Sequence, residues 1–75
     1  MNEKQIRLHS RQEVQDFVQA AEKCNFDIDI SYDRVVIDAK SFLGVLGLGV
    51  SRVLTVKYCG MNTDFENTVQ KYVVA

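Results

Sequence analysis

Ser41 opens the segment of this chain whose residue types are best suited to chemistry at a protein surface. The serine precedes a short, apolar and glycine-rich run that extends from Phe42 to Gly49. A serine in this position is a good helix N-cap, because its hydroxyl accepts a hydrogen bond from an amide two or three residues further on. A phosphate added to the same hydroxyl would meet the positive end of the helix. The segment therefore predicts a helix start that can accommodate a modification.

The apolar side chains after Ser41 predict a surface for a partner. At about 3.6 residues per turn, Phe42, Val45 and Leu46 share one helix face, whereas Leu43 projects elsewhere. At least one of these side chains belongs to the core, but one short glycine-rich helix cannot bury all of them. We expect Phe42, Leu43 and Leu46 to form a partner-binding face.

The second segment of chemical interest is His9-Ser10-Arg11-Gln12-Glu13. Ser10 and Glu13 have the spacing of a capping box, in which Ser10 accepts the amide of Glu13 and the Glu13 carboxylate reaches back to Ser10. In this interpretation His9 is an exposed residue at the end of a strand. Glu13 would also place a negative charge in the first helical turn, where it competes with any other anion for the free amides.

The elements that position these segments follow from alternating hydrophobic periods. Two-residue alternation predicts strands over about residues 5–9, 26–32, 34–38 and 52–59, with a tight turn near Asp33. Helical spacing predicts helices from Arg11 to Cys24, after Ser41, and from a capping box at Thr63-Asp64-Phe65-Glu66 to Ala75. The order β-α-β-β-α-β-α predicts an α+β open-faced sandwich, with three helices on one face of a four-stranded antiparallel sheet.

Composition limits the classes of function. The 75 residues predict a single domain, 1–75, with a small core and no deep pocket. A net charge of -1 gives no attraction for nucleic acid or anionic lipid. Without a long apolar run or a signal peptide, we expect no membrane insertion and a cytoplasmic location. Cys24 and Cys59 are too far apart for a zinc site and fall on apolar positions, so we expect reduced core residues.

The stretch from Asp38 to Gly49 resembles the regulatory-serine segment of the histidine-containing phosphocarrier protein (HPr) family of the bacterial sugar phosphotransferase system. That family has alanine-lysine-serine, two large apolar residues and glycine, as in Ala39-Lys40-Ser41-Phe42-Leu43-Gly44. The similarity extends back to Phe17-Val18-Gln19-Ala20-Ala21 and covers nearly the whole chain from Val18. It weakens before Val18, where the family keeps its catalytic histidine.

The resemblance implies two alternatives for the histidine site. The family places histidine, alanine, arginine and proline in succession at a helix N-terminus, where free amides and the arginine stabilise a phosphoryl group on the imidazole. His9-Ser10-Arg11 is similar to the first three, which implies His9 as phosphoacceptor and Arg11 as its phosphate partner. Counting without gaps from Val18 instead places Ser10 at the phosphoacceptor position and Gln12 at the arginine position. The histidine site is then degenerate.

The resemblance therefore implies a diverged HPr-like protein that acts through protein contacts. The first hypothesis is a regulatory protein-binding module that is switched by phosphorylation at Ser41. In this hypothesis the protein is not an enzyme. Its implied partners are Enzyme I and the sugar-specific components of the phosphotransferase system, and a serine kinase or a transcriptional regulator. The alternative is a genuine phosphocarrier that relays a phosphoryl group through His9 from Enzyme I to sugar-specific components. Neither hypothesis calls for a metal, a cofactor, nucleic acid or a small-molecule substrate pocket.

Overall fold

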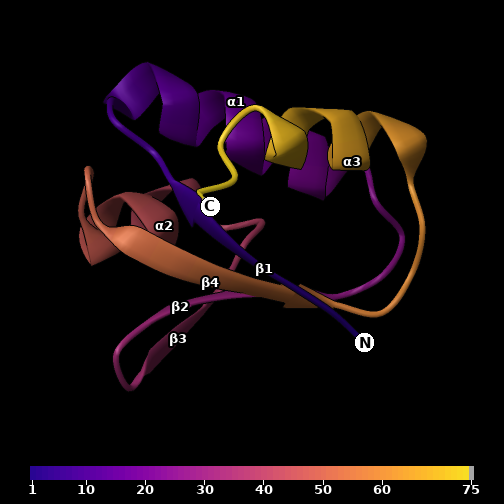
Figure 1. The fold of residues 1–75 in the computed structure, drawn as a ribbon, viewed down its shortest axis with the longest axis horizontal. Helices are drawn as coiled ribbons and strands as arrows, with labels where there is room; N and C mark the ends of the chain where they lie inside the picture. The colour runs from indigo at the N-terminus through magenta and orange to yellow at the C-terminus, as the bar shows by residue number, and fades with distance from the viewer. Residues whose placement is uncertain (75) are drawn as a thin grey trace.

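A computed structural model describes residues 1–74 of the chain, which form four strands and three helices (Figure 1). The strands are β1 (Asn2–Arg7), β2 (Ile28–Tyr32), β3 (Val35–Asp38) and β4 (Val53–Tyr58), and the helices are α1 (Arg11–Glu22), α2 (Phe42–Leu48) and α3 (Thr63–Gln70). The predicted order β-α-β-β-α-β-α is confirmed, with element ends within a few residues of those expected from the sequence.

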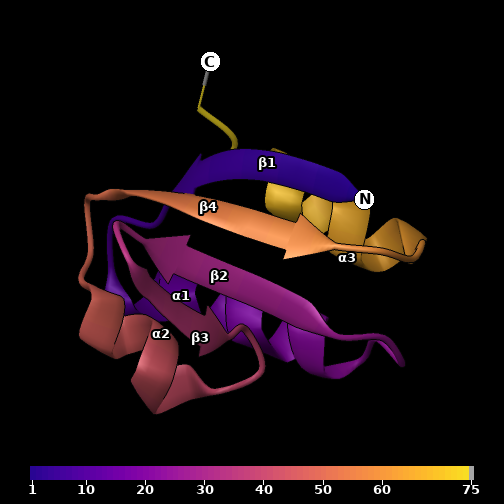
Figure 2. The same cartoon turned by 90° about the horizontal axis from the view of Figure 1, so that it is seen from below.

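The strands form one antiparallel sheet in the order β1-β4-β2-β3. All three helices lie on one face, and the other face is uncovered (Figure 2). The tight turn predicted near Asp33 is also present, and Asp33 adopts a φ of 56°. Aspartate is one of the few residues that tolerate this left-handed conformation. The expected α+β open-faced sandwich is therefore confirmed.

The core lies between the sheet and the helices and is built by the predicted alternation. Ile6, Ile30, Leu54 and Val56 are fully buried and point from three strands toward the helices, where they meet side chains of α1 and α3: Val14, Phe17, Val18, Ala21, Phe65 and Val69. The Phe65 ring lies 5.9 Å from the Phe17 ring and 5.1 Å from the Tyr58 ring, between centroids. Aromatic contacts of this kind join α1, α3 and β4.

Two carboxylates attach α3 and the segment after it to the rest of the fold. Glu66 accepts hydrogen bonds from Lys4 Nζ at 2.7 Å and from the Tyr58 hydroxyl at 2.5 Å. Asp16 on α1 accepts from Lys71 Nζ at 2.8 Å and from the Tyr72 hydroxyl at 2.6 Å. The hydrogen bonds from Lys71 and Tyr72 lower the pKa of Asp16. Both carboxylates thus hold elements of the fold together, and Asp16 does so one helical turn after Glu13.

Two details of the sequence interpretation are wrong in this part of the chain. The cap of α3 is Asn62, not Thr63, because the Asn62 side-chain oxygen accepts the amide of Phe65 at 2.9 Å. Glu66, the expected partner of Thr63 in a capping box, instead binds Lys4 and Tyr58. The helix ends at Gln70, earlier than predicted, and Ala75 lies outside the described residues. Asparagine and threonine are both good caps, so local sequence alone could not choose between the two neighbours.

The two cysteines have different environments. Cys24 is buried as predicted, and burial raises the pKa of its thiol. Cys59, which was also expected in the core, is exposed. It comes directly after Tyr58, the last inward-facing residue of β4, so alternation along the strand turns it away from the core. Both are free thiols.

Candidate functional site

The start of α1 has the serine cap that the sequence predicts. Ser10 is in an extended conformation, and its hydroxyl oxygen accepts the amide of Glu13 at 3.2 Å. Its carbonyl accepts the amide of Val14 at 3.1 Å, which begins the helical hydrogen-bond pattern. The buried side chain of Leu8 and the hydrogen bond from the Ser51 amide to the Leu8 carbonyl, at 2.6 Å, fix the approach to this cap.

The Glu13 carboxylate departs from the predicted capping box. It does not return to Ser10 but accepts the backbone amide of His9 at 2.9 Å. The same oxygen lies 3.3 Å from Nδ1 of the His9 ring, and both side chains are partly open to solvent. A carboxylate therefore already occupies the space between the histidine and the first turn of α1. This is where an incoming anion would have to bind if His9 carried a phosphoryl group.

Arg11 lies beside His9 in sequence, but its side chain turns to a different element. Its guanidinium carbon is 5.6 Å from the centre of the Phe42 ring on α2. An arginine over an aromatic face is attracted by the electron-rich face of the neutral ring, through the ring quadrupole. The structure thus brings together Arg11 and Phe42, which belong to separate sites in the prediction from sequence, and links the starts of α1 and α2.

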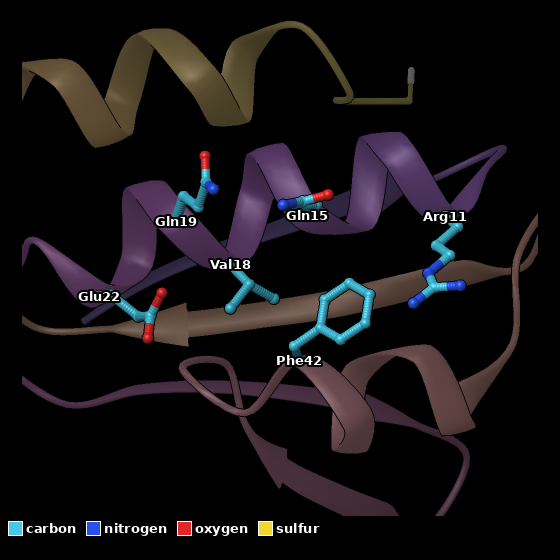
Figure 3. A pocket seen from close by; sticks show the side chains of 6 residues that line it. All are labelled: Arg11, Gln15, Val18, Gln19, Glu22 and Phe42. Atoms are coloured by element: carbon cyan, nitrogen blue, oxygen red, sulfur yellow. The ribbon is translucent and has the colours of Figure 1, made fainter.

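A shallow groove of about 210 Å³ lies between these two helices (Figure 3). Arg11 and Glu22 lie toward opposite ends of it, and Phe42 faces α1 from across the groove. The lining side chains are Arg11, Gln15, Val18, Gln19, Glu22 and Phe42. The α1 side of this groove has no distinct signal in the sequence, because Gln15, Gln19 and Glu22 have the pattern of an ordinary solvated helix face.

The start of α2 is also capped by the predicted serine. The Ser41 hydroxyl oxygen accepts the amide of Gly44 at 3.1 Å, and the Ser41 amide donates to the carbonyl of Asp38 at 3.0 Å. Gly44 permits this tight arrangement, because a Cβ atom there would lie 2.6 Å from Ile37 Cγ2 and 2.9 Å from Ser41 Oγ. Ser41 itself is exposed, and no acidic residue lies in the first turn of α2.

The apolar residues of α2 divide between core and surface. Val45 and Leu48 are buried, Phe42 and Leu46 are half-buried, and Leu43 is 78% exposed. The predicted orientation of Leu43 toward solvent is therefore confirmed. Phe42, Leu43 and Leu46 together place partly or largely uncovered apolar surface directly after an exposed serine. A role for this surface in binding remains a prediction.

The other types of site raised by the sequence have no counterpart in the described structure. Among residues 1–74, no cluster of three or more histidine, cysteine or acidic side chains could hold a metal ion. No helix in the same range is long and apolar enough to cross a membrane. The remaining candidate residues lie at the two serine-capped helix starts and in the groove between them.

Comparison with known proteins gives consistent results in sequence and in structure. Residues 4–70 match the family model described as the PTS HPr component phosphorylation site. An HPr-C-His structure from Thermoanaerobacter tengcongensis is similar with a TM-score of 0.72 and 26% identity, covering 95% of this chain and 93% of that one. The phosphocarrier protein HPr from Bacillus anthracis has the same fold, with a TM-score of 0.72, 22% identity and 95% coverage of both chains. No curated protein matches the chain in sequence.

Proposed function

Since the chain belongs to the HPr family of the phosphotransferase system, we propose that it acts as a regulatory protein-binding module whose switch is phosphorylation of Ser41. The proposal is supported most by the contrast between the two helix starts. The Glu13 carboxylate already binds the backbone amide of His9 and lies beside its ring. Ser41, by contrast, is an exposed residue with no acidic side chain in the first turn of its helix, and the Asp38 carboxylate, which binds the Lys40 amide, precedes the cap.

Electrostatics explain why the His9 position is unfavourable for phosphoryl transfer in this proposal. A phosphoryl group on Nδ1 would be brought next to the Glu13 carboxylate, 3.3 Å from that nitrogen. Two like charges at such a distance repel each other, and the carboxylate competes for the same amides. Arg11, which could have offset this charge, is directed toward Phe42 instead.

The partner face in this proposal is formed by Phe42, Leu43 and Leu46. Leu43 projects into solvent two residues after Ser41, so a phosphate on the serine would lie at the margin of this apolar face. Adding charge and acceptor oxygens there would change which partners can bind without unfolding the helix. Partners are expected among Enzyme I, the sugar-specific components, a serine kinase and a transcriptional regulator.

Calorimetric titration of unmodified and Ser41-phosphorylated protein against these partners tests the proposal. Phosphorylation is expected to change the Kd for at least one partner by about tenfold, within the usual range of coupling between sites. Leu43→Ala should weaken binding, whereas Met61→Ala, an equally exposed residue on the connection between β4 and α3, should not. Equal binding by all four proteins to every partner would refute both the switch and the face.

Relay of a phosphoryl group through His9 is the second candidate function. One observation favours it: the His9 side chain is 59% exposed, so a partner could reach the ring. Labelled phosphoenolpyruvate and Enzyme I provide the test. Transfer as fast as in an ordinary phosphocarrier, abolished by His9→Ala but not by Ser41→Ala, would establish the relay in place of the regulatory function.

A further inference from the structure

The two edges of the sheet differ in how their backbone groups are satisfied. The outer edge of β1 is covered by the chain's own C-terminal segment: the Arg7 amide donates to the Tyr72 carbonyl at 2.9 Å, and the Val74 amide to the Gln5 carbonyl at 3.0 Å. The opposite edge is β3, and within residues 1–74 its only neighbour in the sheet is β2 (Figure 2). An uncovered edge strand is a template for pairing with another strand.

The register of the β2–β3 hairpin determines which backbone groups of β3 point outward. Tyr32 pairs with Val35 across the turn, and the Ala39 amide donates to the Ile28 carbonyl at 2.9 Å. Because hydrogen-bonded pairs alternate along an antiparallel ladder, Val35 and Ile37 bond toward β2. The amide and carbonyl of Val36, between them, therefore point away from the sheet.

The side chains along this edge are apolar in the middle and oppositely charged at the two ends. Val35 is 52% exposed and Val36 is 62% exposed, and both are β-branched residues that favour strands. Arg34 precedes them in the turn and Asp38 ends the strand, and both are exposed. A protected edge would carry like charges or a proline along its length, whereas this one has its apolar residues at the centre.

We propose that β3 is a self-association surface, on which β3 of a second copy pairs in antiparallel orientation centred on Val36. Each Val36 would then exchange both backbone hydrogen bonds with its symmetry mate. Arg34 of each copy would lie opposite Asp38 of the other, which gives two oppositely charged cross-strand pairs. Val35 would lie opposite Ile37, so apolar residues meet apolar residues and the two sheets become one.

Charge complementarity selects this register over its neighbours. Only registers that align outward-facing residues can form the ladder, so the two adjacent alternatives are centred on Val35 and on Ile37. Centring on Ile37 places Arg34 opposite Lys40 and Val36 opposite Asp38. Centring on Val35 places Arg34 opposite Val36. Both alternatives lose the Arg34–Asp38 ion pairs. Each also places a charged residue opposite a like charge or an apolar side chain. Of these three registers, only the one centred on Val36 is complementary in charge.

This association goes beyond the proposed function, because it uses neither Ser41 nor His9. The shared strand is short, so the dimer is expected to be weak, as small interfaces are. A dilution series from about 2 mM to about 10 µM, which spans such weak association, should shift the ¹⁵N-amide resonance of Val36 in nuclear magnetic resonance spectra. Sedimentation equilibrium over the same range should show a dimer at the upper end.

Charge-reversed variants test the register. Arg34→Asp and Asp38→Lys each place like charges opposite each other in their own dimers, so each alone should have a Kd raised by about tenfold or more. Mixed in equal amounts, the two variants place opposite charges at both positions, and the mixture should dimerise again. Lys23→Asp, which makes the same change in charge on the exposed end of α1, should dimerise as the parent does.

The Asp38 carboxylate also accepts the Lys40 amide at 2.9 Å, so Asp38→Lys removes a hydrogen bond within the chain as well as a charge. A variant at another position therefore separates loss of association from loss of folding. Val36→Asp changes an exposed side chain and would place two carboxylates opposite each other at the centre of the pair. Circular dichroism would first show that Asp38→Lys and Val36→Asp are folded. The folded Val36→Asp protein should then be monomeric. A parent protein that stays monomeric at the highest concentration, a dimer unaffected by Val36→Asp, or a mixture that fails to regain association would overturn the proposal.

Discussion

Two helices of this molecule begin with a serine cap, but the two starts have different surroundings. At α1 the third helical residue is Glu13, whose carboxylate binds the amide of His9 and lies beside its ring. At α2 the third residue is Gly44, which has no side chain, and the exposed Leu43 precedes it. At both starts a carboxylate binds the amide of the residue before the cap, but at α1 it comes from Glu13 in the first helical turn, whereas at α2 it comes from Asp38, which precedes the helix. We propose that the side chains in the first turn after a cap influence whether the cap can also serve as a site for modification.

The largest expected effect concerns the glycine that makes the α2 start compact. Gly44→Ala would place a Cβ atom 2.6 Å from Ile37 Cγ2 and 2.9 Å from Ser41 Oγ. We expect it to lower the free energy of unfolding by about 1–3 kcal/mol, as overpacking does. Gly47→Ala is the matched control in the same helix, because nothing lies within 4 Å of its added Cβ. The control should be neutral or stabilising by up to about 1 kcal/mol. Urea denaturation that shows equal stability for the two variants would contradict this account of the α2 start.

The two capping hydrogen bonds should contribute about equally to the stability of the fold. Ser10→Ala and Ser41→Ala each remove a hydroxyl that accepts a backbone amide, so each should cost about 1 kcal/mol of stability. Ser41→Asp should retain most of the stability, because aspartate is also a good cap. Thermal unfolding of the three variants checks these expectations. An unchanged midpoint for Ser10→Ala would show that its capping bond contributes nothing to stability.

Removing the Glu13 carboxylate from the first turn of α1 should make this helix start more favourable for a phosphoryl group. Glu13→Gln keeps the size of the side chain but removes the repulsion between the carboxylate and a phosphoryl group near His9. Phosphoryl transfer from Enzyme I should then rise by about two- to fivefold, the effect expected from one charge at a helix terminus. Glu22→Gln, at the other end of α1, is the control and should leave transfer unchanged. If Glu13→Gln transfers no faster than that control, Glu13 is not what limits the site.

The smallest effect concerns the far side of α1, where Asp16 holds Lys71 and Tyr72. Hydrogen bonds from these two residues lower the pKa of Asp16 in the folded protein. The stabilisation is therefore fully present above the pKa of an unfolded aspartate, about 3.9, and is lost as the pH falls through the lower pKa of the folded state. Asp16→Asn should reduce stability at neutral pH and flatten the acid part of the stability curve. If the free energies of unfolding of the parent and the variant fall in parallel as the pH is lowered, Asp16 does not have this role.

The sequence predicts the layers of the fold because the hydrophobic periods are regular. Ile28 and Ile30 alternate with Asp29 and Ser31, and the structure buries the former and turns the latter outward. Both serine caps were also predictable, since a cap is a local interaction between residues three positions apart. The same local character explains the misplaced cap of α3, where two suitable residues are neighbours. Cys59 was misassigned because its apolar type was given more weight than the alternation of β4, in which Tyr58 points inward and Cys59 therefore turns outward.

The features that the sequence could not predict depend on contacts between distant elements or on a choice of partner. Arg11 meets Phe42 only because α1 and α2 lie side by side, and no local pattern signals that contact. Glu13 could reach back to the amide of either Ser10 or His9, and only the path of the chain from Leu8 decides in favour of His9. Both facts concern the histidine segment, for which the two alternatives, His9 with Arg11 or Ser10 with Gln12, stay predictions.

The most direct test of the account is to map where phosphate is attached after the protein has been exposed to both donors. The purified chain would be incubated with Enzyme I and phosphoenolpyruvate together with a serine kinase of this system and ATP, and intact peptides would be mapped by mass spectrometry under conditions that preserve phosphohistidine. We expect phosphate on Ser41 and at most slow, partial labelling of His9. Rapid and complete labelling of His9, with Ser41 unmodified, would contradict it.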